Sequence, residues 1–452
     1  MSTLSQQKDI IERTCKSYLG LPLIPISKLQ AESSRDVPSR GPVWISRSHF
    51  PAPPEDGLKE ALFTIIDSLK EPEHIIQSPA ELDQVNVGVE FISNRKGARE
   101  GDTEPDISEP EKLKRIENDL ETDTVILYIH GGGLYFSSPA AYRASSVRLA
   151  RLTGALVAST SYRLCPQHTF PAPLLDVLIA YTTLIHTYIP RLPGIKRVVL
   201  AGNSAGATLA FGLVKFLLEF NKRPDPTVMF HGQIINLPLP EGIAVVSSWC
   251  DPTDSLPSWL NPNATDILTS LQPALWPEFP PDKIWPSNPP REHPYARAAT
   301  LDHELVNPAA VRDWTGAPPM WITVGGLERG RDGNAVVASQ AAKCGVSVTW
   351  TEWEGMCHEW MIVTRGLPQA SLTFKLWAEA CMKLSSDQTK AKSPAILYRM
   401  PDCVPVEILG GVEELNQVAF DAVRRLMKIR NKQRPIWVGK PRNGGKTGQA
   451  QL

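Results

Sequence analysis

The sequence lacks the marks of a disulfide-bonded, zinc-binding or membrane-spanning protein. Its seven cysteines are odd in number and scattered, and none of them stands in a C-x-x-C spacing. This usage is typical of a reducing compartment and indicates no zinc site. No uninterrupted apolar run approaches the roughly 20 residues that cross a bilayer. The polar N-terminus (residues 1–9) has no apolar signal core, so we expect a soluble, cytoplasmic protein.

An excess of charge of one sign is also missing. The formal net charge is -1 over 452 residues, which gives no overall attraction to nucleic acid or to a membrane surface. One local exception runs from Arg424 to Lys446, where nine Lys and Arg side chains occur without an acid. This tail either contacts an anionic membrane surface peripherally or is a helix end followed by a disordered, solvated segment. We expect no nucleic-acid partner and no transmembrane segment, and the sequence does not indicate an oligomeric state.

Short apolar runs that favour β-structure recur along the chain. Most are unbroken rather than alternating, as in strands covered on both faces. Helical stretches separate several of them, for example residues 140–152, 173–188, 205–220 and 334–344. The alternation predicts an α/β fold with a mainly parallel sheet between helices. The predicted strands are residues 85–92, 124–129, 155–161, 197–201, 243–248, 320–324 and 346–351.

Four segments depart from this alternation and define the predicted organisation. An N-terminal helical segment covers residues 1–84, and the catalytic α/β domain covers 85–385. Within that domain, residues 94–123 are rich in acids and turn formers and predict a solvated loop. Residues 250–318, rich in proline and tryptophan, predict an insertion over the sheet. Residues 386–452 form a C-terminal extension that ends in the basic tail.

The sequence Gly202-Asn-Ser-Ala-Gly206 stands between a predicted strand and a predicted helix. Small residues permit a sharp strand-to-helix turn, and that turn would expose the hydroxyl of Ser204 at its apex. We therefore predict Ser204 as a nucleophile. Alone, this motif is more often an ordinary serine in a glycine-rich turn.

Two further motifs strengthen the prediction. His130-Gly131-Gly132-Gly133 follows the strand at 124–129, and its free backbone N–H groups, with that of Ala205, would form an oxyanion hole. A phosphate-binding loop is the alternative, but no G-x-x-x-x-G-K-[ST] or G-x-G-x-x-G pattern accompanies the glycines. His358 follows the last predicted strand, where it could act as the base.

A carboxylate that orients His358 should come from the loop after the strand at 320–324. Both Glu328 and Asp332 lie there, and both preserve the chain order of nucleophile, acid and base. Ordinary roles are a surface salt bridge for Glu328 and a helix N-cap for Asp332. From the residues alone, either Glu328 or Asp332 could be the carboxylate that orients His358.

These motifs together resemble the hormone-sensitive-lipase branch of the α/β-hydrolases, in particular its fungal members. Further matches are Tyr162-Arg-Leu-Cys-Pro166 with Phe170-Pro-Ala172, and Ser247-Ser-Trp-Cys-Asp251. The family usually carries its acid in a D-P-L-R-D pattern. Aligning the final Arg-Asp of that pattern on Arg331-Asp332 implies that Glu328 is the acid, with Asp332 as the alternative.

The resemblance has exceptions, and it also implies a cap. Asn203, Ala207, Ser161 and Gln167 replace the family's usual Asp, Gly, Asp and Glu, which removes no catalytic atom but changes charge around the turn. The family's cap implies that residues 1–84 and 250–318 cover the site. Five tryptophans are candidates for lining its pocket: Trp249, Trp259, Trp276, Trp285 and Trp314.

The sequence thus predicts a serine carboxylic-ester hydrolase that needs no metal or organic cofactor. The tryptophan-rich insertion favours short to medium acyl chains. Two alternatives stay open: a non-catalytic small-molecule receptor on the same fold, and a hydrolase of amides or formamides.

Overall fold

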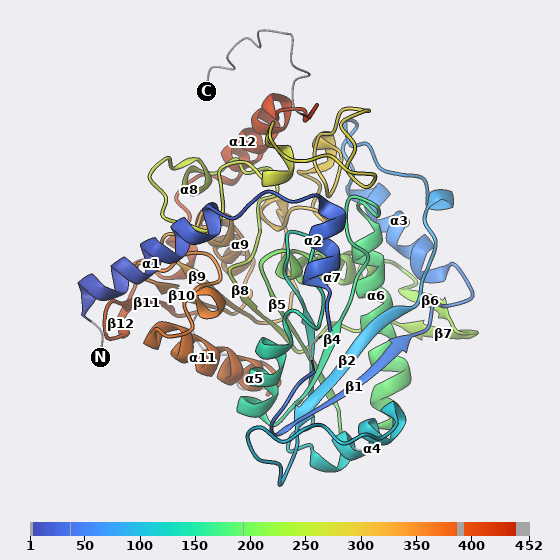
Figure 1. Ribbon diagram of the computed structural model, residues 1–452. Helices are drawn as coiled ribbons and strands as arrows, with labels where there is room; N and C mark the ends of the chain where they lie inside the picture. The colour runs from blue at the N-terminus through green and yellow to red at the C-terminus, as the bar shows by residue number, and fades with distance from the viewer. Residues whose placement is uncertain (1–2, 37, 193, 387–392, 440–452) are drawn as a thin grey trace.

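The computed structural model describes residues 3–36, 38–192, 194–386 and 393–439, and is built around one ten-stranded sheet (Figure 1). The spatial order is β1-β2-β4-β3-β5-β8-β9-β10-β11-β12. The seven strands from β4 to β11 run parallel, whereas β1, β2 and β12 pair antiparallel with their neighbours. The strands are β1 (Val43–Phe50), β2 (Val87–Asn94), β3 (Thr124–Ile129), β4 (Leu156–Thr160), β5 (Arg197–Asn203), β8 (Gly242–Val246), β9 (Met320–Gly325), β10 (Val348–Trp353), β11 (Ala395–Arg399) and β12 (Val404–Glu407).

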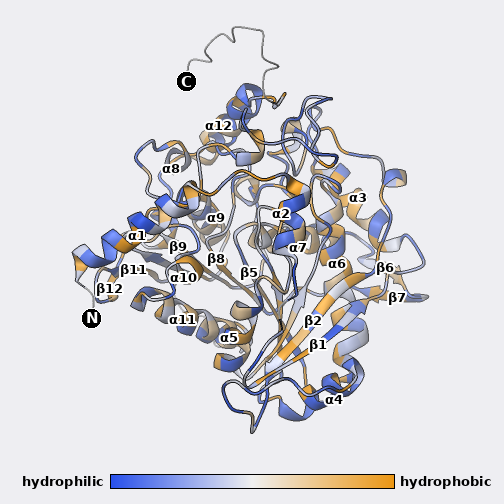
Figure 2. Cartoon of the chain, viewed as in Figure 1, coloured by the Kyte–Doolittle hydropathy of each residue, from blue (hydrophilic) through white to orange (hydrophobic). Residues whose placement is uncertain are grey.

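Helices cover both faces of the sheet, which explains why its central strands are apolar throughout. In β3, the side chains of Val125 and Leu127 belong to one hydrophobic cluster, and those of Ile126 and Tyr128 belong to the other. The apolar colouring of the strands in Figure 2 reflects this burial on both sides. The first cluster contains residues of α3 (Gly57–Leu69), α6 (Ala172–Thr183), α7 (Ser204–Asn221) and α9 (Arg331–Lys343), and the second those of α5 (Arg143–Thr153) and α11 (Pro368–Leu384).

All seven predicted strands are present, and the predicted α/β fold with a mainly parallel sheet is confirmed. Five further strands lie where the sequence predicted none. Two of them, β6 (Thr227–Phe230) and β7 (Gln233–Asn236), form a separate antiparallel pair. The other three belong to the main sheet. β1 belongs to the N-terminal segment, which was expected to be helical. β11 and β12 belong to the C-terminal extension, so this extension widens the sheet.

Two predicted segments differ in detail from the expectation. The charged loop at 94–123 contains helix α4 (Glu109–Asp119), which begins with a Ser108 N-cap and packs Ile116 into the core. The extension contains helix α12 (Phe420–Gln433), whose Val423 and Met427 are fully buried. Its last described residues are also ordered, with Arg434 and Trp437 buried. The basic residues of the tail from Lys440 onward lie outside the described residues.

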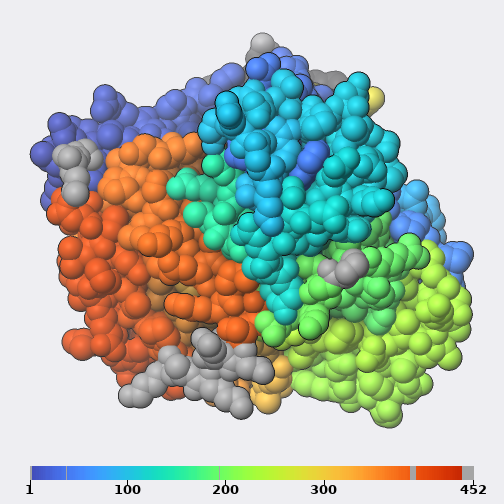
Figure 3. Space-filling view, turned by 90° about the horizontal axis from the view of Figure 1, so that it is seen from below, coloured from blue at the N-terminus to red at the C-terminus, as the bar shows by residue number. Residues whose placement is uncertain are grey.

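The insertion lies above the carboxyl ends of the parallel strands, and α12 lies over it (Figure 1). Apart from α8 (Pro257–Leu260) and three short 3₁₀ turns, it is irregular chain. The N-terminal helices α1 (Leu4–Leu19) and α2 (Ile26–Ser33) cross the front of the molecule. In Figure 3 the first residues lie beside the C-terminal third of the chain, where Gln7 donates to the carbonyl of Pro401.

Within the described residues, one helical stretch, Ala172–Arg191, is long and apolar enough to cross a membrane. Most of it is buried inside the protein. A buried core helix passes the same criteria of length and composition.

Candidate active site

Ser204 lies at the junction of β5 and α7, at the carboxyl edge of the sheet. Its backbone adopts a positive φ of 49°, which is uncommon for a residue with a side chain and marks a strained turn. The turn is tight because α7 approaches the end of β3. A Cβ atom on Gly206 would lie 2.2 Å from the carbonyl oxygen of Ile129 and 2.4 Å from that of His130. Glycine at position 206 is therefore a steric requirement of the turn.

Three of the predicted site residues form a hydrogen-bonded chain. The hydroxyl of Ser204 lies 2.9 Å from Nε2 of His358, and Nδ1 of His358 lies 3.1 Å from Oε2 of Glu328. All three side chains are buried or nearly so. Glu328 is itself held by the backbone N–H of Gly325 (2.6 Å) and the hydroxyl of Ser247 (2.7 Å). With Nδ1 donating to Glu328, Nε2 is free to accept the Ser204 proton.

Charge around His358 sets its affinity for a proton. Burial of the imidazole by itself lowers its pKa, but the hydrogen bond and charge of Glu328, with Glu359 and Asp266 nearby, outweigh burial and raise the pKa to about 9. Burial also raises the pKa of Glu328, and its bond from His358 opposes that rise. The arrangement therefore stabilises an imidazolium, which is the state that a general base reaches after taking a proton.

The glycine run lies beside Ser204. A Cβ on Gly131 would be 3.1 Å from that of Ser204, and one on Gly132 would be 2.2 Å from the carbonyl of Phe136. Among the described residues, no acceptor binds the N–H of Gly132 or Gly133. Ala205 is in the first turn of α7, where N–H groups lack intrahelical acceptors. These N–H groups are available for an oxyanion.

His130 supports this loop and does not reach Ser204. Its Nδ1–H donates to the carbonyl of Gly131 at 2.8 Å, and its ring stacks on Tyr162 with a centroid distance of 4.3 Å. Burial lowers its pKa to about 4, so the ring is neutral at neutral pH. From the N-terminal segment, Gln30 donates to the carbonyl of Tyr135 and Ser33 accepts the N–H of Ser137. Helix α2 therefore anchors the far end of the glycine loop.

Asp332 lies away from His358. Its Oδ2 accepts the backbone N–H of Ser258 in α8 (2.8 Å), and its own N–H donates to the hydroxyl of Ser258 (3.1 Å). The residue is in the first turn of α9, whose N-cap is Gly330. The expectation that Asp332 is the N-cap of its own helix is thus wrong. Its carboxylate instead accepts a backbone N–H in the first turn of another helix, α8.

A cavity of about 140 Å³ opens at Ser204. Its walls come from the glycine loop and from the insertion, and no described residue of 3–84 lines it. Of the five candidate tryptophans, Trp249 and Trp259 line the cavity. The other three pack elsewhere: Trp276 and Trp285 beside Trp437, and Trp314 on Phe211. The lining residues are Gly132, Gly133, Tyr135, Phe136, Tyr142, Ser204, Trp249, Trp259, Ile267, Leu268, Thr269, Gln272, Pro273, His358 and Glu359.

Two buried carboxylates at the site were not predicted. Glu359 accepts hydrogen bonds from the amide of Asn203 and from the hydroxyl of Tyr142 (3.1 Å). The replacement of the family's usual Asp by Asn203, together with an acid next to His358, was a signal in the sequence. Asp266 accepts the backbone N–H of His358 at 2.8 Å. It stands in an irregular segment without a recognisable motif, so no sequence signal identified it.

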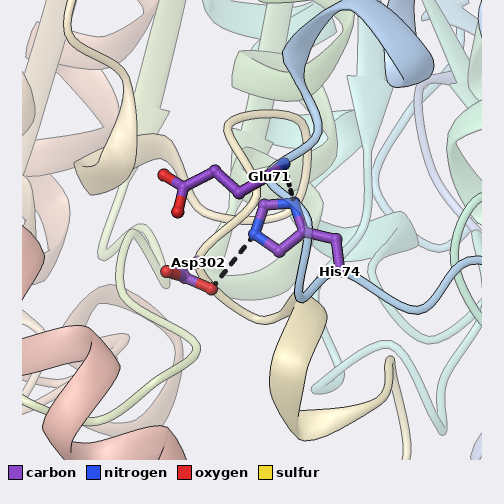
Figure 4. A group of neighbouring side chains, drawn as sticks. All are labelled: Glu71, His74 and Asp302. Atoms are coloured by element: carbon purple, nitrogen blue, oxygen red, sulfur yellow. Dashed lines mark hydrogen bonds and ion pairs between the residues drawn. The ribbon is translucent and has the colours of Figure 1, made fainter.

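Among the residues that the structure describes, one group outside this site has side chains of the types that bind metals: Glu71, His74 and Asp302 (Figure 4). His74 Nδ1 accepts the backbone N–H of Glu71 at 3.0 Å, so the neutral ring carries its proton on Nε2, which faces Asp302 at 3.4 Å. A protonated nitrogen cannot ligate a metal. Arg424 (2.6 Å) and Lys428 already neutralise the Glu71 carboxylate. The cluster fits an ionic attachment of α12 rather than a metal centre.

Comparisons with known proteins agree with this architecture. Residues 126–362 match a family model described as alpha/beta hydrolase fold. An acetyl-hydrolase of Streptomyces hygroscopicus is 32% identical over 235 residues, which cover 52% of this chain and 67% of the relative. An esterase of Acinetobacter venetianus is 24% identical over 61% of this chain and 80% of its own length. An arylacetamide deacetylase of Oryctolagus cuniculus is 30% identical over 34% of this chain and 37% of its own length.

Solved structures share the fold at low sequence identity. An esterase of the bacterial hormone-sensitive lipase family superposes with a TM-score of 0.54 at 19% identity, over 85% of this chain and all of that one. The structure of EstE5, from a crystal soaked with p-nitrophenyl butyrate, superposes with a TM-score of 0.54 at 17% identity, over 84% of this chain and 97% of that one. Because the family model spans more than half of the chain, this protein belongs to the α/β-hydrolase family and resembles its hormone-sensitive-lipase branch.

Proposed function

We propose that this carboxylesterase-type hydrolase cleaves esters of short to medium acyl chains, with Ser204 as nucleophile, His358 as base and Glu328 as the acid that orients the base. The observation that carries the proposal is the continuous hydrogen-bonded chain from Ser204 through His358 to Glu328 at the floor of an apolar cavity. Nucleophile and base within hydrogen-bond reach, and a third group that orients the base, are the geometric requirements of this chemistry.

In the proposed reaction, the Ser204 oxygen attacks the ester carbonyl carbon while its proton moves to His358 Nε2. The resulting oxyanion accepts hydrogen bonds from the N–H groups of Gly132, Gly133 and Ala205. Collapse of the tetrahedral intermediate expels the alcohol, which takes the proton back from Nε2. A water molecule then donates a proton to the same nitrogen and attacks the acyl-enzyme. Collapse of this second intermediate breaks the bond to the Ser204 oxygen, which takes the proton back from Nε2, and the carboxylic acid is released.

The size of the cavity supports the preference for short acyl chains. About 140 Å³ is small beside the roughly 300–1,000 Å³ of pockets that hold drug-sized ligands. Trp249, Trp259, Tyr135 and Phe136 form aromatic walls that a long chain would have to displace. A series of p-nitrophenyl esters from acetate to palmitate tests this part. A higher kcat/KM on palmitate than on butyrate would contradict it.

Replacement of Ser204 by alanine tests the central assignment. Turnover of p-nitrophenyl butyrate by Ser204→Ala should fall by at least about 10⁴-fold, because the acyl-enzyme cannot form. The folded state of the variant is checked by its thermal unfolding. Turnover close to that of the unsubstituted protein would overturn the proposal.

The two alternatives from the sequence are separated by different measurements. A fluorophosphonate probe should label Ser204 in the folded protein, whereas a non-catalytic receptor would remain unlabelled. The partial similarity to an arylacetamide deacetylase makes amide cleavage worth measuring on the same preparation. Faster hydrolysis of an aryl acetamide than of the matching aryl acetate would identify an amide hydrolase.

A further inference from the structure

Asp266 joins the insertion to both loops that carry the proposed base and acid. Its Oδ1 accepts the backbone N–H of His358 at 2.8 Å, and its Oδ2 accepts the backbone N–H of Arg329 at 2.8 Å. Arg329 directly follows Glu328 in the sequence. Asp266 is only 1% exposed, so both bonds form away from water.

Arg329 makes the reverse connection. Its guanidinium donates to the carbonyl of Trp259 at 2.6 Å, to that of Asn261 at 3.1 Å and to that of Leu268 at 3.0 Å. The residue is 9% exposed. Asp266 on the insertion therefore binds the backbone of the catalytic loops, and Arg329 on a catalytic loop binds the backbone of the insertion. We call these two side chains the Asp266–Arg329 clamp.

The clamp binds backbone groups in and after α8, where the chain becomes irregular. Helix α8 ends at Leu260, and the chain from there to the 3₁₀ turn at Pro273 is irregular, so its carbonyls have no ladder to bind them. Buried backbone groups without partners are costly, and charge-assisted hydrogen bonds to them are among the stronger ones. The bonded segment supplies Trp259, Ile267 and Leu268 to the cavity wall. The clamp thus fixes the position of that wall relative to Ser204 and His358.

We propose that Asp266 and Arg329 are positioning residues that hold the cavity wall against the catalytic loops and thereby limit the length of the acyl chain. This inference rests on the proposed ester hydrolysis, because it assigns the wall to the acyl side of that reaction. The two halves of the clamp have different consequences. Arg329 holds the wall, whereas Asp266 also holds the backbone of His358.

The Arg329→Met variant tests the first half. It keeps the bulk of the side chain and the backbone N–H that binds Asp266, but it releases three carbonyls of the wall. We expect the ratio of kcat/KM on p-nitrophenyl octanoate to that on the butyrate to rise at least about tenfold, since each accommodated methylene adds favourable burial. If this variant does not fold, Arg329→Lys is a milder test. An ammonium group lacks the planar fork that binds the three carbonyls, so it should release part of the wall and raise the ratio by a smaller factor.

The Asp266→Asn variant tests the second half. Its amide group cannot accept both N–H groups, and one negative charge near His358 is lost while those of Glu328 and Glu359 remain. We expect kcat to fall by about tenfold on short and long esters alike. We also expect the acidic limb of the pH profile to move to lower pH, an effect that loss of stability alone would not produce.

The control is Arg163→Met, which removes another largely buried arginine. Arg163 pairs with Asp176 at 2.7 Å and is absent from the cavity lining. It should lower stability and leave the octanoate-to-butyrate ratio unchanged. If the folded Arg329 variant has the same octanoate-to-butyrate ratio of kcat/KM as the unsubstituted protein, the proposed role of the clamp is wrong. Fluorophosphonate labelling separates the two hypotheses, because an unlabelled unsubstituted protein would refute the proposed hydrolysis itself.

Discussion

The side-chain amide of Asn203, next to the nucleophile, donates to the carboxylate of Glu359, next to the base. The carbonyl oxygen of the same amide accepts the hydroxyl proton of Tyr128 at 2.6 Å. An amide satisfies both neighbours, because its nitrogen donates and its oxygen accepts. Aspartate, which the family usually carries at position 203, would offer no donor to Glu359.

The Asn203→Asp variant should therefore be destabilised. It would bring two buried carboxylates into contact, so one of them must take up a proton or remain unpaired. We expect the free energy of unfolding to fall by about 1–3 kcal/mol at pH 8, measured by urea denaturation. The loss should shrink at acidic pH, where one carboxyl is protonated.

The double variant Asn203→Asp with Glu359→Gln is the matched control. This pair again has one amide donor and one carboxylate, but the amide at position 359 now donates to the carboxylate at position 203. It should recover most of the lost stability. If the double variant is no more stable than Asn203→Asp alone, the two side chains are not coupled as described.

The pH profile of kcat/KM should have its acidic limb above pH 6.5. His358 must be neutral to accept the Ser204 proton, and its pKa is raised to about 9. Activity should therefore fall as pH drops through that range. Because Glu359 contributes to the rise, Glu359→Gln should shift the limb to lower pH. A limb at the same pH in both proteins would contradict the electrostatic role of Glu359.

Protonation of His358 should also affect the free energy of unfolding. Lower pH reduces activity, but it should increase the contribution of His358 to stability. A histidine whose pKa is higher in the folded state stabilises the fold below its unfolded pKa of about 6.5. That contribution should be lost as pH rises through about 9. The His358→Gln variant should show a flatter dependence of unfolding free energy on pH across this window.

The turn around Ser204 should not tolerate a methyl group at position 206. Gly206→Ala would place a carbon 2.2 Å from the carbonyl of Ile129, so β3 and α7 would have to separate. We expect the free energy of unfolding to fall by about 1–3 kcal/mol and esterase activity to become undetectable. Ala207→Gly, one residue along the same helix, should cost only about 0.5–1 kcal/mol, the usual penalty of glycine in a helix. Equal tolerance at both positions would contradict the packing.

The two acids after β9 should behave differently on substitution. Glu328→Ala should lower kcat by about 10²–10⁴-fold with little change in the folded structure, because His358 loses the group that fixes its tautomer. Asp332→Ala should lower stability by about 1 kcal/mol through the lost cap of α8, and turnover should change less than about fivefold. The opposite pattern would make Asp332 the third member of the triad.

The sequence predicted the parts of the site that a local motif determines. Ser204 is identified by the small residues of its turn, and the glycines at 131–133 by their own run after a strand. The choice of Glu328 over Asp332 needed an alignment, since both residues fit the chain order. In the structure they diverge because Glu328 precedes α9, whereas Asp332 lies within its first turn.

Local sequence patterns did not predict contacts between residues that are far apart in the chain. Asp266 reaches His358 across 92 positions, and no periodicity of the insertion indicates that approach. β1 was missed because Ser46, Arg47 and Ser48 interrupt its apolar residues, although Ser46 is buried against α4. β11 was missed because it is only five residues long, although helix α11 precedes it in the chain.

The last strand of the sheet offers a poor surface for strand addition by a second molecule. A parallel sheet that ended at β11 would present a free row of N–H and C=O groups, on which a second molecule could align. β12 occupies that position for only four residues, and Pro405 opposite Tyr398 has no N–H to offer. Short length and a proline are both obstacles to strand addition at an exposed border. We therefore expect the C-terminal extension to disfavour edge-to-edge self-association at this border of the sheet.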